Sequence, residues 1–214
     1  MDSLYVSALI QRARREWPTV QAHAEAILAL ATEHGFARHV ALGVSLRGMA
    51  LAGQGQRAEG FTQMRQGLAA VRATGTAAGM PGHLASLVEA YGQVGQVDEG
   101  INLLAEALAL VGTTGERQME AELHRLHGEL LLRQAVPDAR HAEACFQQAL
   151  TVARRQQAKS WELRGAMSLS RLWQQQGKRD KARQLLAPIY GWFTEGSDTA
   201  DLREARALLE ELGG

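Results

Sequence analysis

The sequence predicts an all-α fold made of repeated antiparallel helix pairs. When the chain is aligned on itself at a shift of about forty residues, one set of positions keeps its apolar or small character through five segments. Such self-similarity is the signature of a repeat architecture. Within a segment these positions are spaced i, i+4, i+7, i+8 and i+11, which is one face of an α-helix. No segment alternates apolar and polar residues with β-branched enrichment, so no sheet is expected.

Composition narrows the class of protein. The chain has 214 residues, of which 46% are hydrophobic and 21% charged, as is ordinary for a soluble globular protein. Its formal net charge is +0, so no overall field attracts nucleic acid or an anionic membrane. The single Cys145 excludes an intrachain disulfide, and no signal peptide or membrane-spanning apolar run is present. We therefore expect a cytoplasmic protein that does not cross a membrane, and the neutral charge disfavours nucleic acid as a partner.

We call the residues at one aligned position of the five segments a column. The second helix of each pair carries the most regular columns. The first of these columns reads Val20, Gly60, Gly100, Ala142 and Ala182, and the column four residues later reads Ala24, Met64, Leu104, Phe146 and Leu186. A matching column in the first helix of each pair reads Gly48, Val88, Gly128 and Ser170. Small residues in these columns predict that two helix backbones approach closely, because a larger side chain would force the axes apart.

Glycine and proline mark the ends of the helices. Pro18 and Pro81 stand where a first helical turn tolerates a missing N–H, and glycines separate the periodic stretches. The predicted pairs cover about residues 2–34, 36–74, 80–114, 116–157 and 159–195, followed by a capping helix at 198–212, in one domain of residues 1–214. Pro188 is the exception, because it lies inside the helix predicted for residues 179–193 and should kink it.

One glycine-rich stretch, "LAGQGQRAEGF" at residues 51–61, has the outline of a phosphate-binding loop. Such a loop needs the spacing G-x-x-x-x-G-K-[ST], in which the lysine neutralises the phosphates. The lysine is missing here, and a similar outline recurs as "YGQVGQVDEGI" at residues 91–101. The recurrence predicts helix-ending turns of a repeat.

The two-helix unit resembles the tetratricopeptide repeat (TPR), although the period of about forty residues is longer than the usual 34 or so. The segments "EAELHRLHGELLLRQ" (120–134), "AEACFQQALTVARRQQAKSWELR" (142–164) and residues 170–212 are similar to the C-terminal region of large bacterial signalling proteins. In those proteins a nucleotide-cyclase or winged-helix domain and a P-loop ATPase precede the helical array. The resemblance implies a right-handed α-solenoid that serves as the sensing or scaffolding arm of such a protein.

By the same resemblance, the first helix of each pair lines a concave groove that binds a partner. The positions carried over to this sequence are Glu89, Gln93, Glu122, Arg125, Glu129, Arg133, Arg164, Arg171, Gln174 and Gln175. The second half of this groove holds more arginines than glutamates, so we expect a protein or peptide partner that presents acidic groups. A neighbouring ATPase or cyclase domain is a further candidate partner.

Several residues have the right chemistry for catalysis or metal binding. His124 and His127 lie one helical turn apart and could ligate zinc, but both occupy packing columns and the third ligand of a catalytic site is missing. His141 and Cys145 share a helix face and could form a thiolate–imidazole pair. A cysteine beside apolar columns more commonly serves as a small buried hydrophobic residue. The tryptophans are interpreted as packing residues, and Trp161 could line a groove. We therefore expect no catalytic site, no metal and no cofactor.

Three hypotheses about function remain open. The first is a non-catalytic protein interaction or scaffold module. The second is an effector-sensing domain that binds a small ligand or nucleic acid and changes its curvature. The third is an enzyme that uses the histidine pair. The first is favoured because the groove positions are polar while the packing columns are apolar, as expected for a solvated binding surface.

Overall fold

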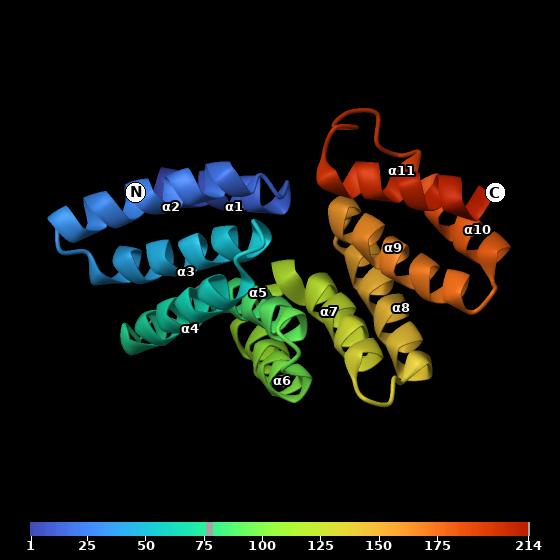
Figure 1. Ribbon diagram of the computed structural model, residues 1–214, viewed down its shortest axis with the longest axis horizontal. Helices are drawn as coiled ribbons and strands as arrows, with labels where there is room; N and C mark the ends of the chain where they lie inside the picture. Colours follow the sequence, from blue (N-terminus) through green and yellow to red (C-terminus); the bar gives the residue numbers. More distant parts are fainter. Residues whose placement is uncertain (76–78, 214) are drawn as a thin grey trace. The chain divides into compact units, whose positions relative to one another are not determined.

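The computed structural model describes residues 1–75 and 79–213, and every regular element in these residues is a helix, which confirms the all-α prediction (Figure 1). The chain divides into two compact units, Met1–Thr114 and Gly115–Gly214. That residues 1–214 form a single domain stays a prediction. None of the described helices is both long and apolar enough to cross a membrane.

The first unit consists of consecutive helices that pack against one another as pairs. They are α1 (Asp2–Ala13), α2 (Trp17–Glu33), α3 (Ala37–Gly53), α4 (Arg57–Ala73), α5 (Met80–Gln93) and α6 (Val97–Thr114). The packing columns form the core, since Val20, Ala24 and Ile27 of α2 are all fully buried. Pro18 and Pro81 lie in the first turns of α2 and α5, as predicted.

The second unit begins with a short 3-10 helix and continues the alternation of helices. Its elements are η1 (Arg117–Met119), α7 (Glu120–Arg133), α8 (Ala139–Arg155), α9 (Lys159–Gln175), α10 (Arg179–Tyr190) and α11 (Ala200–Gly213). Asp138 caps α8 by accepting a hydrogen bond from the backbone N–H of His141 at 2.9 Å, which satisfies one of the unpaired donors at a helix start. One hydrophobic core runs through the consecutive helices from α8 to α11 and includes residues such as Phe146, Leu163 and Leu186.

The stretch at residues 51–61 spans the turn between α3 and α4. It contains the last residues of α3 and the start of α4, and Gly55 between them has φ +93°. The corresponding Gly95 between α5 and α6 has φ +80°. Backbone in this left-handed region favours glycine because a Cβ would crowd the chain. The glycines therefore end helices, as their recurrence in the sequence predicts.

The helix predicted for residues 179–193 is shorter in the structure. Pro188 lies inside α10, and the helix ends two residues later at Tyr190. Proline has no backbone N–H to donate to the Gln184 carbonyl, and its ring clashes with that carbonyl, so it weakens the last turn. Trp192 and Phe193 consequently leave the helix and belong to the connection that leads to α11.

Candidate functional site

Three helices of the second unit bring charged residues of the predicted groove together. We name this surface the α7–α9–α11 face and define it by Glu122, Arg125, Glu129, Arg133, Arg164, Ser168, Arg171, Gln174, Gln175, Asp201, Glu204 and Glu211. Helix α9 packs against both α7 and α11, so that side chains from α9 reach carboxylates on either side. The residues of α11 in this face were absent from the sequence prediction.

The inner part of the face is a network of hydrogen bonds and ion pairs around Arg125. Its guanidinium donates to both carboxylate oxygens of Glu122, at 2.8 and 2.7 Å, and to Glu129 at 3.2 Å. Ser168 of α9 donates to the same Glu129 carboxylate at 2.7 Å. Glu122 is only 5% exposed, and Arg125 offsets its buried charge through a two-pronged contact, which is the stronger kind of ion pair.

Arg164 connects the network to α11. Its Nε donates to Asp201 at 2.6 Å, while its Nη1 lies 3.9 Å from Glu122. The guanidinium also lies 5.0 Å from the centre of the Trp161 ring, within the range of a cation–π contact. The predicted groove residues Glu122, Arg125 and Arg164 are thus brought together, but as a largely buried support.

The outer part of the face is open to solvent. Arg171 pairs with Glu204 at 3.2 Å, and their side chains are 45% and 41% exposed. Gln174 donates to Glu211 of α11 at 3.3 Å, and Arg133 and Gln175 are exposed. These outer residues are the ones that a partner can reach. The remaining predicted positions, Glu89 and Gln93, are exposed on α5 in the first unit.

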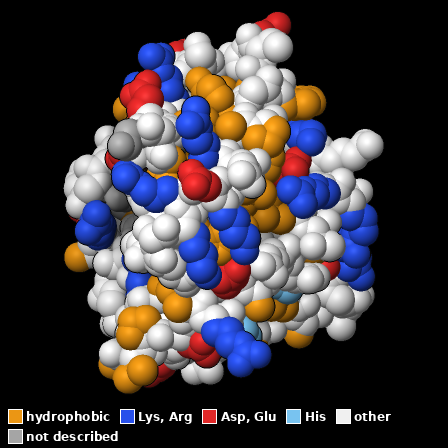
Figure 2. Space-filling view, turned by 90° about the vertical axis from the view of Figure 1, so that its right-hand side faces the viewer, with side chains coloured by type: hydrophobic (Ala, Val, Ile, Leu, Met, Phe, Trp, Pro, Cys, Tyr) orange, Lys and Arg blue, Asp and Glu red, His pale blue; other side chains and the backbone are white. Residues whose placement is uncertain are grey.

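The expected excess of positive charge on this face is offset within the second unit. Asp201 and Glu204 of α11 add two carboxylates next to Arg164 and Arg171. On the side of the molecule that Figure 2 displays, Lys and Arg side chains are mixed with Asp, Glu and hydrophobic side chains. An acidic partner stays a prediction, and it depends on the outer arginines.

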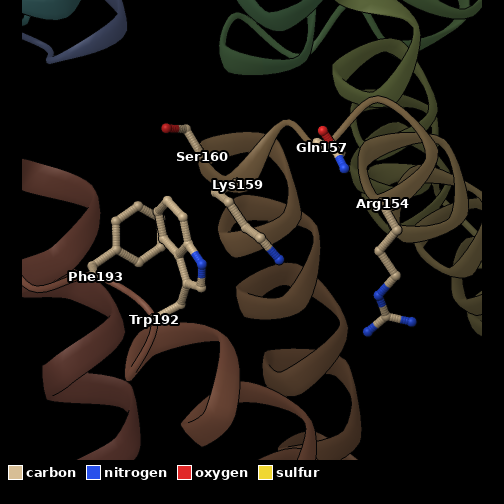
Figure 3. A pocket seen from close by; sticks show the side chains of 6 residues that line it. All are labelled: Arg154, Gln157, Lys159, Ser160, Trp192 and Phe193. Carbon is tan, nitrogen blue, oxygen red and sulfur yellow. The ribbon is translucent and has the colours of Figure 1, made fainter.

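A cavity of about 630 Å³ lies elsewhere in the second unit, where α8 ends and α9 begins (Figure 3). It is lined by Arg154, Gln157, Lys159, Ser160, Trp192 and Phe193. Its volume falls in the range of small-molecule sites, roughly 300–1,000 Å³. From the sequence, Trp192 was interpreted as a packing residue, and none of these residues was assigned to a binding site.

A buried carboxylate holds the two cations of this cavity. Glu162, 4% exposed, accepts hydrogen bonds from Arg154 at 2.8 Å and from Lys159 at 2.7 Å. Burial alone would raise the pKa of Glu162, but these hydrogen bonds and the two positive charges outweigh it and lower the pKa. Glu162 is therefore ionised at neutral pH and keeps both cations beside the cavity.

The interpretation of every tryptophan as a packing residue is wrong for Trp192. Its side chain is 58% exposed, because Pro188 ends α10 before this position. Trp192 contacts Phe193 edge to face with ring centres 5.1 Å apart, and the Lys159 ammonium lies 5.6 Å from the centre of its ring. Trp173, by contrast, is buried in the core as predicted.

Of the histidine and cysteine candidates, His141 is exposed and the other three are partly or fully buried. His124 and His127 are half-buried, and burial lowers the pKa of both. The rings of His127 and His141 meet edge to face with their centres 5.4 Å apart. Burial, and then the charge of Asp138, raise the pKa of the buried Cys145 thiol. Within residues 1–75 and 79–213, no group of three or more His, Cys, Asp or Glu side chains is arranged to hold a metal ion.

The first unit contains a buried polar cluster that the sequence did not reveal. His83 of α5 is 4% exposed and hydrogen bonds through its two ring nitrogens to Tyr5 of α1 and Ser45 of α3, each at 3.0 Å. Burial, aided by the nearby positive charges of Arg12 and Arg38, lowers the pKa of His83 to about 4. The cluster ties three helices together through a neutral imidazole.

Two solved structures resemble the chain in fold. The crystal structure of the nearly identical TPR-like repeats of a putative kinesin light chain from Podosopora anserina matches with a TM-score of 0.58 and 17% identity, over 98% of this chain and 95% of that chain. A form of the same repeats with one substitution matches with a TM-score of 0.61 and 18% identity, over 89% and 92%. The sequence matches no protein-family model and no curated protein sequence. The chain thus has the all-α fold of TPR-like repeat proteins.

Proposed function

We propose that this chain is a non-catalytic protein interaction or scaffold module that binds its partner on the α7–α9–α11 face. The observation that carries this proposal is the layered construction of the face. Buried ion pairs around Arg125 and Arg164 hold the inner layer, and exposed polar side chains such as Arg171 and Gln175 stand above it. A prearranged polar surface loses little freedom when a partner docks, which favours binding.

The partner is a protein or peptide that presents acidic groups to the outer arginines. Arg171 is 45% exposed although it pairs with Glu204, so it keeps donors that a carboxylate can reach. Its guanidinium can grip a carboxylate in two places, which gives direction as well as strength. We propose that the chain acts in the cytoplasm as the interaction arm of a bacterial signalling protein, next to an ATPase or cyclase domain.

Photo-cross-linking tests the location of the partner. A photoreactive amino acid in place of Gln175, which is exposed on α9, should capture the partner during purification from the native host. The matched control is the same amino acid at Gln148, an exposed glutamine on α8. Equal capture from both positions, or capture from Gln148 alone, would place the partner outside the α7–α9–α11 face.

An effector-sensing domain is the second candidate function. The cavity beside Trp192 and Lys159 supports it, because its volume of about 630 Å³ suits a small molecule. The two functions are compatible, since the cavity and the α7–α9–α11 face share no residue.

A further inference from the structure

The turn between α8 and α9 has an unusual backbone for its sequence. Gln157 has φ +55°, in the left-handed region that favours glycine because it disfavours residues with a Cβ. At the same place in the three preceding joints between pairs the chain has Gly35, Gly75 and Gly115, with φ of +71°, +71° and +75°. Glycine would serve the turn better at position 157. Arg15, with φ +60°, is the one other described residue with a Cβ in this region. A side chain at such a strained position motivates a search for a use beyond folding.

Gln157 is also one of the residues that line the cavity. The wall next to it carries two cations, Arg154 and Lys159. Arg154 donates a hydrogen bond to Glu162 through its Nε, and Lys159 donates one through its ammonium group. Within the described part of the chain, no residue accepts a hydrogen bond from the terminal amino groups of Arg154, whose side chain is 54% exposed. One buried carboxylate therefore faces two cations, and donors remain for an anion.

The opposite wall is aromatic. Figure 3 shows the rings of Trp192 and Phe193 next to each other, with the Lys159 ammonium between the Trp192 ring and the Arg154 guanidinium in that view. An indole ring that is 58% exposed offers a flat face on which another ring can stack. Trp192 has its place at the cavity because α10 ends at Tyr190.

We infer that this cavity binds a small anion that carries a flat aromatic ring, such as an aromatic carboxylate or a nucleoside monophosphate. The ring stacks on Trp192, the negative group accepts hydrogen bonds from Arg154 and Lys159, and the Gln157 amide bonds a polar atom of the ring or its substituent. The ligand needs both the aromatic ring and the negative group. The charge of Glu162 already neutralises one of the two cations, so charge attraction alone is weak. The site shares no residue with the α7–α9–α11 face, so its failure would leave the proposed function standing.

Calorimetric titration with four probes tests the ligand chemistry. Adenosine 5′-monophosphate and 2-naphthoate carry a ring and a charge, adenosine carries only the ring, and inorganic phosphate only the charge. We expect each of the first two to bind at least about tenfold more tightly than adenosine or phosphate, since stacking and charge each contribute to affinity. Equal affinity for all four probes, or no binding of any of them at about 5 mM, would overturn the inference.

Two variants test the residues without disturbing the fold. Trp192→Ala should weaken the binding of adenosine 5′-monophosphate about tenfold or more through the loss of stacking. Gln157→Gly should weaken it severalfold while the melting temperature stays the same or rises, since glycine suits the left-handed turn. Phe36→Ala is the control, because Phe36 is a 48% exposed aromatic in the first unit and should leave the affinity unchanged. Affinities of both test variants equal to that of the parent would overturn the assignment of the site.

Discussion

Gly48 of α3 and Gly60 of α4 face each other so closely that neither can carry a side chain. A Cβ on Gly48 would lie 2.7 Å from the carbonyl oxygen of Gly60, and a Cβ on Gly60 would lie 2.5 Å from that of Gly48. Both atoms that would be met belong to the backbone, so relief requires the two helices to separate. The small-residue columns read from the sequence thus correspond to a direct backbone contact.

The first prediction compares two glycines in helices. Gly60→Ala should destabilise the protein by about 1–3 kcal/mol, because overpacking outweighs the better helix propensity of alanine. Gly112→Ala in α6 is the control, because a Cβ there meets no atom within 4 Å, and it should stabilise by roughly 0.5–1 kcal/mol. Urea denaturation measures both changes, and shifts of the same sign for the two variants would refute the close contact.

The second prediction separates the inner and outer layers of the α7–α9–α11 face. Arg125→Met should cost about 3–5 kcal/mol, because it leaves the 5% exposed Glu122 without its two-pronged partner. Arg171→Met should cost about 0–1 kcal/mol, since its ion pair is solvent-exposed. The measurement is the free energy of unfolding in urea, and similar costs for both substitutions would mean that the inner network is not a structural support.

The third prediction concerns pH. The pKa of His83 is lowered to about 4 in the folded protein, whereas it is about 6.5 in an unfolded chain. The neutral form is therefore favoured by folding, and this contribution is complete above about pH 6.5 and is lost as the pH falls toward 4. The loss should reach about 3 kcal/mol.

His83→Gln is the matched variant, because an amide can still bond to Tyr5 and Ser45 but does not titrate in this range. Unfolding free energies of parent and variant, measured at pH 7, 5.5 and 4, should converge or cross as the parent loses stability. A constant difference between the two across this range would show that His83 titrates normally.

The fourth prediction concerns α11. Its buried residues Leu202, Ala205 and Leu208 belong to the core that joins α8 to α11, and its Asp201 holds Arg164. Removal of residues 199–214 should lower the melting temperature and the solubility, because solenoids need a terminal helix to cover the last apolar face. A truncated protein that is as soluble and as heat-stable as the parent would show that α11 adds nothing to the core.

The helices and their contacts were predictable because they depend on local chemistry that repeats. Apolar spacing fixes which face of a helix is buried, and small residues such as Gly48 and Gly60 mark where two backbones meet. The end of α10 could not be placed as reliably. Pro188 was seen to disturb the helix, but a proline near a helix end can either bend the helix or stop it.

The candidate site was predictable only in part, because it depends on pairing between helices. Periodicity places Arg125 and Arg164 on the polar side of their helices but does not reveal Asp201, which lies 37 residues after Arg164 in the chain. The cavity forms where the end of α8, the start of α9 and the segment after α10 come together, and no local pattern reveals this meeting. The only local signal for it was Gln157, which stands where three other joints have glycine.

The affinity of the captured partner for an Arg171→Glu variant tests the central claim most directly. Arg171 is 45% exposed and lies outside the buried network, so the variant should fold with a nearly unchanged melting temperature. If an acidic partner docks on the α7–α9–α11 face, reversal of this charge should weaken binding at least about tenfold. An affinity equal to that of the parent, in a variant shown to be folded, would contradict the proposal that this face binds the partner.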